Sequence, residues 1–116
     1  MNPPLEQITV QALAEKMAID PELSNLQLVD VRETQELEIA SIPGFVHLPL
    51  SGYEQWQGDI HTRLDTDKET LVLCHHGMRS AQMCQWLMAQ GFTQVKNIIG
   101  GIDAYSTYVD RTVPKY

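Results

Sequence analysis

The chain is 116 residues long, close to the commonest size of a single domain, and we expect one domain that covers residues 1–116. Its 8 basic and 15 acidic residues give a formal net charge of −7, which provides no electrostatic attraction to nucleic acid or to an anionic membrane. Hydrophobic residues make up 43% of the chain, which argues against disorder, and no apolar run approaches the ~18 residues of a membrane span.

The hydrophobic pattern alternates between helix and strand along the chain. In chain order, we expect an irregular arm over residues 1–8, a helix over 10–18, a strand over 26–31, a helix over 33–40, a strand over 45–48, a strand over 69–73, a helix from 80 or 81 to 90, a strand over 95–99, a helix over 102–108 and a tail over 112–116. This alternation predicts an α/β fold with a mainly parallel sheet.

Two segments are ambiguous at this level. Thr9 either lies in a short edge strand over residues 8–10 or caps the first helix. In the stretch from residue 51 to residue 69, apolar residues recur at a spacing that predicts one or two short helical turns packing an aromatic edge. These residues are Tyr53, Trp56, Ile60 and Leu64.

The strand predicted over residues 69–73 leads directly into Cys74, and a polar loop then leads into a helix. A thiol in this place lies at the carboxyl end of a strand, and the helix that follows directs its free N–H groups back at it. Such surroundings favour an anion and therefore the thiolate, which is the nucleophilic form of cysteine. The predicted active-site loop consists of Cys74, His75, His76, Gly77, Met78, Arg79 and Ser80.

The residue types in this loop suit an anionic sulfur. The backbone N–H groups of residues 75–80 can surround one sulfur as an anion nest, which stabilises a thiolate or the outer sulfur of a persulfide. Gly77 provides the unrestricted φ that a tight loop needs. Arg79 carries a permanent charge and a fork of donors that fits an oxyanion such as a sulfonate or sulfate group. His75 and His76 either orient a substrate or add positive charge.

A metal site is the weaker interpretation of the same residues. Cys74, His75 and His76 are all metal-ligand types, but adjacent side chains are expected to diverge. The sequence also has no second Cys/His pair at zinc spacing. We therefore expect neither a metal nor another cofactor.

A second group of polar residues ends the strand predicted over residues 26–31. Asp30 and Arg32 fall at its carboxyl end, the edge at which open α/β sheets build their sites. They are either a surface ion pair or residues that support the site.

The chain has two cysteines and no sign of secretion. Two cysteines do not suggest a disulfide framework, and no basic segment followed by an apolar one opens the sequence, so a cytoplasmic location is expected. Cys84 falls on the core-facing side of its predicted helix. Packing explains it better than a role as a resolving thiol.

Five stretches of the sequence resemble, in order and spacing, the single-domain rhodanese-like sulfurtransferases. They are residues 28–33 (LVDVRE), 42–44 (IPG), 74–80 (CHHGMRS), 91–95 (GFTQV) and 100–105 (GGIDAY), and the match runs from about residue 8 to 106. The resemblance implies a three-layer fold with a five-stranded, mainly parallel sheet flanked by helices. The chain departs from the family pattern at residues 40–41, Ala-Ser where Gly-His is usual, and at Tyr105, where tryptophan is common.

The resemblance also implies an activity. Cys74 would take a sulfur atom from a small anionic donor such as thiosulfate, and the resulting persulfide would pass it to cyanide or to a thiol acceptor, protein thiols included. Arg79 would meet the anionic part of the donor. Asp30 and Arg32 would prop the loop or the neighbouring helix.

Loop length separates this interpretation from its nearest rival. Related cell-cycle phosphatases share the fold but have five residues between cysteine and arginine, whereas four separate Cys74 from Arg79. The shorter loop favours sulfur over a tetrahedral phosphate. The alternatives are a sulfur-relay or regulatory binding module with little turnover and, less favoured, a phosphatase or arsenate reductase on the same scaffold.

Overall fold

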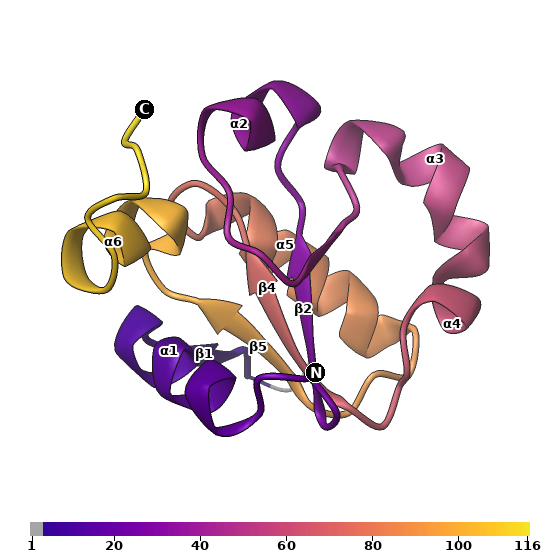
Figure 1. The fold of residues 1–116 in the computed structure, drawn as a ribbon. Helices are drawn as coiled ribbons and strands as arrows, with labels where there is room; N and C mark the ends of the chain where they lie inside the picture. Colours follow the sequence, from indigo (N-terminus) through magenta and orange to yellow (C-terminus); the bar gives the residue numbers. More distant parts are fainter. Residues whose placement is uncertain (1–3) are drawn as a thin grey trace.

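The computed structural model describes residues 4–116, in which five strands form one sheet with helices on both faces (Figure 1). Residues 1–3 of the predicted arm lie outside the described residues. The strands are β1 (Glu6–Ile8), β2 (Leu26–Asp30), β3 (Phe45–His47), β4 (Glu69–Leu73) and β5 (Val95–Ile98). The α-helices are α1 (Val10–Ile19), α2 (Thr34–Ile39), α3 (Tyr53–Trp56), α4 (Ile60–Arg63), α5 (Met78–Ala89) and α6 (Gly101–Tyr108). The 3-10 turns are η1 (Leu50–Gly52) and η2 (Gln57–Asp59).

The sheet confirms the predicted fold class. Its strand order is β1-β5-β4-β2-β3, and every neighbouring pair is parallel, so β4 lies at the centre. The register pairs Asp30 at the end of β2 with Leu73 at the end of β4. Because both strands end at the same level, the segments that follow them emerge side by side at one edge of the sheet. The N–H of Val31 donates to the carbonyl of Leu73 at 3.0 Å there.

Side-chain alternation along β4 decides which layer receives the cysteine. Helices α1 and α6 cover one face of the sheet, and α3, α4 and α5 cover the other (Figure 1). Leu71 and Leu73 pack in the core cluster that α1 and α6 complete. Val72 and Cys74 pack in the cluster completed by α3, α4 and α5, because successive residues of a strand point to opposite faces. Cys74 therefore lies against α5, the helix that follows it.

Most predicted bounds differ from those of the structure by no more than one residue, and two places differ by more. Helix α5 begins at Met78, two or three residues earlier than predicted, because Gly77 precedes it as an N-cap in the left-handed conformation. At the N-terminus, residues 6–8 are an edge strand paired with β5 rather than an irregular arm. Thr9 then caps α1 and accepts the N–H of Ala12 at 3.1 Å, so the cap is confirmed, while the edge strand lies over residues 6–8 instead of 8–10.

The C-terminal tail packs on the rest of the molecule. The sequence places residues 112–116 beyond the matched core. In the structure Val113 is buried, and its carbonyl accepts the hydroxyl of Ser106 at 2.6 Å. The last residue, Tyr116, reaches the loop that follows β4, where its ring stacks on His75. The tail is thus part of the surroundings of the predicted site.

The uncertain stretch before β4 forms four short helical segments, η1, α3, η2 and α4. Trp56, Ile60 and Leu64 are buried in the α5-side core, as their spacing predicts. Tyr53 is 39% exposed but packs edge-on against Trp56, with ring centroids 5.4 Å apart. This stretch covers the sheet beside α5.

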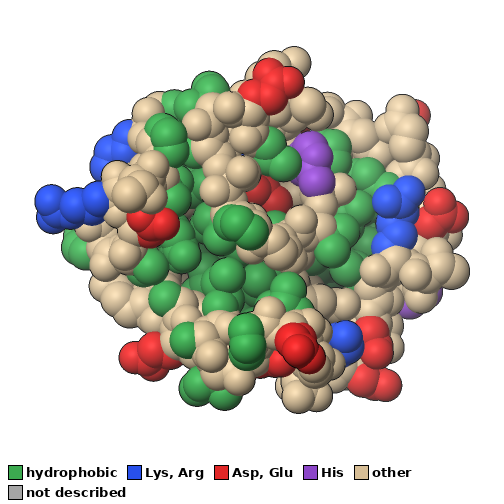
Figure 2. All heavy atoms as spheres, in the orientation of Figure 1, with side chains coloured by type: hydrophobic (Ala, Val, Ile, Leu, Met, Phe, Trp, Pro, Cys, Tyr) green, Lys and Arg blue, Asp and Glu red, His purple; other side chains and the backbone are tan. Residues whose placement is uncertain are grey.

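The surface carries mixed charges. On the face drawn in Figure 2, acidic side chains and a few lysine and arginine side chains lie mostly toward the margins, and apolar side chains show near the middle. No helix within residues 4–116 is long and apolar enough to cross a membrane. The cytoplasmic location stays a prediction.

Candidate active site

Cys74 is the first residue after the central strand β4 and is almost fully buried, with 1% of its surface exposed. Two donors converge on its sulfur. The backbone N–H of Gly77 lies 3.0 Å from Sγ, and the hydroxyl of Ser80 lies 3.3 Å from it. Both come from the start of α5, so the strand, the loop and the helix together build one binding position for sulfur. Donors aimed at a sulfur stabilise negative charge on it.

The predicted ring of six N–H groups is not what surrounds Sγ. Of the backbone N–H groups of residues 75–80, that of Gly77 hydrogen-bonds to the sulfur. A ring around the outer sulfur of a persulfide stays a prediction. Gly77 has φ of +103°, which confirms that the loop needs a residue free to adopt positive φ.

Asn97 on β5 is a site residue that the sequence did not single out. It is buried, its amide N–H donates to the carbonyl of Gly77 at 3.1 Å, and its oxygen accepts from the hydroxyl of Ser80. A hydroxyl has one proton to donate, so Ser80 directs it either to Asn97 or to the sulfur of Cys74. The signal in the sequence is an uncharged amide among the mostly apolar residues of β5.

The start of α6 holds the loop from the other side. The N–H of Ile102 donates to the carbonyl of Cys74 at 3.0 Å, and the N–H of Asp103 donates to that of His75 at 3.1 Å. These N–H groups belong to the first turn of α6 and have no partner within the helix. Each hydrogen bond therefore satisfies a carbonyl of the loop and an N–H of the helix at the same time. Residues 100–105, one of the five stretches that carry the family resemblance, therefore form a turn and also hold the active-site loop in place.

Arg79 does not face an open anion site. Its Nη1 and Nη2 donate to the two carboxylate oxygens of Glu36 on α2, at 2.7 and 2.8 Å. This hydrogen-bonded contact is the main cause that lowers the pKa of Glu36 to about 2, and the same pair raises the pKa of Arg79. The donor fork that the sequence assigns to an oxyanion is thus occupied by a carboxylate of the chain itself.

His75 and His76 lie together, so the prediction that their side chains diverge is wrong. Their rings stack with centroids 3.9 Å apart, and the other face of His75 stacks on Tyr116, also at 3.9 Å. Burial, followed by the charge of His76, lowers the pKa of His75. The lowered pKa disfavours the positively charged form of His75.

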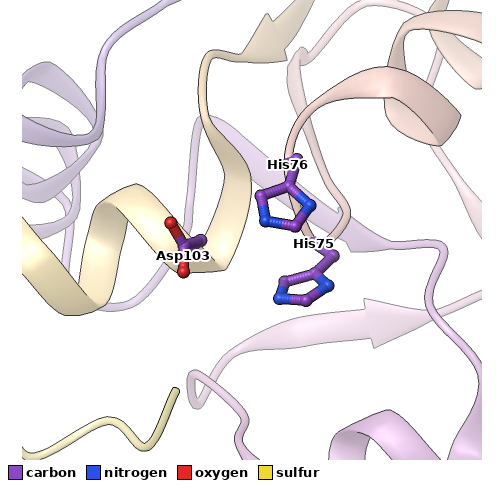
Figure 3. A group of neighbouring side chains, drawn as sticks. All are labelled: His75, His76 and Asp103. Carbon is purple, nitrogen blue, oxygen red and sulfur yellow. The ribbon is translucent and has the colours of Figure 1, made fainter. Parts of the chain in front are cut away.

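The two histidines and Asp103 form a group whose ligand atoms lie within 4.8 Å of one another (Figure 3). As they stand they fit a metal ion poorly. The two histidine rings are stacked, with centroids 3.9 Å apart and planes 28° apart, so their in-plane lone pairs lie in two separate planes and not in one. The carboxylate of Asp103 also accepts from Lys115 Nζ at 3.1 Å. The Nε2 atom of His75 is buried without a hydrogen-bond partner.

Asp30 and Arg32 form a buried ion pair and not a surface one. Arg32 Nη2 lies 2.8 Å from the carboxylate of Asp30, and the two side chains are 0% and 2% exposed. The guanidinium also donates to the carbonyl of Ala40 at 2.9 Å and to the hydroxyl of Tyr116 at 2.9 Å. The pair thus ties the end of β2 to α2 and to the C-terminal residue.

Cys84 lies in the core cluster that also contains Cys74 and is fully buried on α5. Burial raises the pKa of its thiol to about 12, and the charge of Cys74 adds to the effect. A thiol in this state is a packing residue and a poor nucleophile at neutral pH.

Comparison with known proteins gives one consistent family. The chain matches the Rhodanese-like domain over residues 9–108. It is 47% identical over 113 residues to a chloroplastic protein of Arabidopsis thaliana, Rhodanese-like/PpiC domain-containing protein 12, a match that covers 97% of this chain but only 38% of that protein. It is 36% identical over 104 residues to the thiosulfate sulfurtransferase GlpE of Pseudomonas savastanoi pv. phaseolicola, covering 89% of this chain and 87% of that protein. A Rhodanese-like domain protein from Staphylococcus aureus has a similar solved structure, with a TM-score of 0.74 and 25% identity over 97% of this chain and 99% of that one.

Proposed function

Because the chain belongs to the rhodanese-like domain family, we propose that it is a sulfurtransferase in which Cys74 carries the transferred sulfur. The observation that carries the proposal is the N–H of Gly77, which donates to Sγ, together with the hydroxyl of Ser80, which is a second donor to Sγ when its proton is not directed to Asn97. Gly77 is the N-cap of the twelve-residue helix α5, and Ser80 lies in its first turn, so the N-terminus of this helix points at the sulfur. The same donors stabilise the attacking thiolate and a sulfur anion formed from it.

The reaction has two half-reactions that share the persulfide. In the first, the thiolate of Cys74 attacks the outer sulfur of thiosulfate, a new S–S bond forms, and the old S–S bond breaks with its electron pair leaving on sulfite. The persulfide Cys–S–S⁻ retains one negative charge. In the second, cyanide or a thiolate attacks the outer sulfur, and the electron pair of the S–S bond returns to Cys74. The cycle is a ping-pong scheme with a covalent intermediate.

Thiosulfate is the donor to test first. The name of the Pseudomonas relative, thiosulfate sulfurtransferase, applies to that protein and supports the choice here. The four-residue spacing between Cys74 and Arg79 supports sulfur over phosphate as the group that enters the loop. A protein thiol is a further acceptor to test, because its thiolate can attack the outer sulfur of a persulfide in the same way as cyanide.

The decisive experiment is mass spectrometry of the intact protein after incubation with thiosulfate. The wild type should gain the mass of one sulfur atom and lose it again when cyanide is added. Cys74→Ser should gain nothing, whereas Cys84→Ser should still gain one sulfur, because Cys84 is a core residue.

A Cys74→Ser protein that still gains the sulfur would contradict the assignment. So would hydrolysis of an aryl phosphate by a wild type that forms no persulfide, since this outcome supports a phosphatase on the same scaffold. Persulfide formation without steady-state release of thiocyanate supports the sulfur-relay alternative.

A further inference from the structure

The guanidinium of Arg79, which the sequence assigns to an anionic donor, is already hydrogen-bonded to a carboxylate of the chain itself. Both oxygens of the Glu36 carboxylate accept from Arg79, at 2.7 and 2.8 Å. A carboxylate and one edge of a sulfonate or sulfate present the same pair of acceptors to a guanidinium. An oxyanion that binds Arg79 in this way must therefore first displace Glu36.

Glu36 is held in place by contacts other than Arg79. Its carboxylate accepts the backbone N–H of Glu33 at 2.9 Å in a capping box at the start of α2, and it accepts the hydroxyl of Tyr116 at 2.9 Å. The carbonyl of Glu36 itself lies 3.4 Å from Arg32 Nη1, which adds a weak contact from the buried ion pair. Displacement of the carboxylate thus costs several hydrogen bonds and not one.

Other positive groups beside the loop do not replace Arg79. Lys115 is paired with Asp103 at 3.1 Å. His75 is stacked between His76 and Tyr116, and burial lowers its pKa, which disfavours its charged form. The chain as a whole carries −7. A doubly charged donor therefore meets a site whose arginine is already neutralised.

We propose that Glu36 is a specificity-determining residue that competes with oxyanions for Arg79 and so directs the site toward persulfide donors that carry no oxyanion. The inference rests on the proposed sulfurtransferase function. With a donor R–S–S–H, the thiolate of Cys74 attacks the outer sulfur, which keeps its proton, and the S–S electron pair leaves on R–S⁻. This transfer releases no sulfite and does not require Arg79 to leave Glu36.

The test removes the charge of Glu36 and keeps the shape of its side chain. Glu36→Gln retains an oxygen that can accept the capping N–H of Glu33. Glu38→Gln is the matched control, because it makes the same charge change on an exposed side chain of the same helix. Persulfide formation on Cys74 is followed by intact-mass spectrometry at increasing concentrations of two donors, thiosulfate and the persulfide of 2-mercaptoethanol.

For Glu36→Gln, the thiosulfate concentration that gives half-maximal rate should fall about fivefold, which is the scale of a partly exposed ion pair. The value for the 2-mercaptoethanol persulfide should stay unchanged. Glu38→Gln should behave as wild type with both donors. Equal changes in the two variants, or no change with thiosulfate, would overturn the inference.

A binding measurement separates this inference from the proposed function. Inorganic sulfate is titrated calorimetrically into Cys74→Ser and into the same protein with Glu36→Gln added. Tighter sulfate binding in the double variant is expected, and equal binding contradicts the role of Glu36. If no protein gains sulfur from either donor, the sulfurtransferase proposal fails, while the sulfate titration still decides whether Glu36 competes for Arg79.

Thermal melting checks that Glu36→Gln is folded. If it is not, Tyr116→Phe offers a milder change, because it removes one donor from Glu36 and leaves the pair with Arg79. It should lower the half-maximal thiosulfate concentration in the same direction by a smaller factor. No shift in a folded Tyr116→Phe protein would then count against the inference.

Discussion

Gly101 is the residue that allows the loop and helix α6 to touch. Its φ is +60°, and a Cβ placed on it would lie 2.3 Å from the carbonyl oxygen of Cys74 and 2.4 Å from that of His75. No side-chain carbon tolerates such distances to backbone atoms. The same carbonyls accept the first N–H groups of α6, so the close approach is what completes the loop.

Gly101→Ala should therefore damage both stability and activity. We expect a loss of about 3 kcal/mol or more in the free energy of unfolding, from backbone strain added to a steric clash that moves the loop. Gly91→Ala is the control, since Gly91 also has positive φ, +96°, but has no atom within 4 Å of the added carbon. It should cost about 1 kcal/mol. Urea unfolding measures both, and equal losses would show that strain alone matters.

At the level of elements, α2 is held by polar contacts. It is six residues long and buries none of its residues, so apolar packing contributes little to its position. Arg32 bonds to the carbonyl of Ala40 at its C-terminal end, and Glu36 bonds to Arg79 at the start of α5. The placement of α2 beside the active site therefore depends on ionised side chains.

This dependence predicts how stability changes with pH. The pKa of Glu36 is lowered, chiefly by the hydrogen bonds from Arg79, from 4.5 to about 2. A carboxyl group whose pKa is lower in the folded state adds stability above its unfolded pKa and loses it as the pH falls toward its folded pKa. The stability advantage of wild type over Glu36→Gln should thus shrink as the pH falls from about 4.5 to about 2.

Urea unfolding of both proteins across this pH range measures the difference. Glu38→Gln, which changes an exposed carboxylate on the same helix, should show no comparable trend. A difference between wild type and Glu36→Gln that is independent of pH would contradict the ion pair with Arg79 as its cause.

For the whole molecule, net charge affects how fast an anionic donor arrives. The chain carries −7, and thiosulfate carries two negative charges, so their long-range interaction is repulsive. Salt screens this repulsion, because the Debye length falls from about 30 Å at 0.01 M to about 8 Å at 0.15 M ionic strength.

The second-order rate constant for persulfide formation from thiosulfate should therefore rise as sodium chloride is added over this range. A persulfide carries at most one negative charge, so the rate constant for the persulfide of 2-mercaptoethanol should rise less steeply with salt, and this donor serves as the reference. Stopped or quenched reactions followed by intact mass give both rate constants. A rate constant for thiosulfate that falls with salt would show that a local positive field dominates over the net charge.

The helices and strands that the sequence predicts correctly are those whose hydrophobic pattern is visible among neighbouring residues. The strand over residues 69–73 has the predicted bounds, and α1 and α6 begin and end within a residue of theirs. The start of α5 differs from the predicted one because it depends on the positive φ of Gly77. That φ is set by how the loop packs and not by the residue pattern. Residues 6–8 form a strand only because β5 offers them a partner, which a local pattern does not reveal.

The sequence by itself determined the family, the parallel α/β fold and the place of Cys74 at the end of a central strand, because periodicity and motif spacing are properties of neighbouring residues. Only the tertiary structure decided what each polar side chain of the site meets. Glu36 and Arg79 are 43 residues apart in the chain, and Tyr116 and Glu36 are 80 apart. Such contacts follow from how α2, α5 and the C-terminal tail pack around the edge of the sheet. The oxyanion fork predicted at Arg79 is therefore occupied by a residue that no local pattern connects with it.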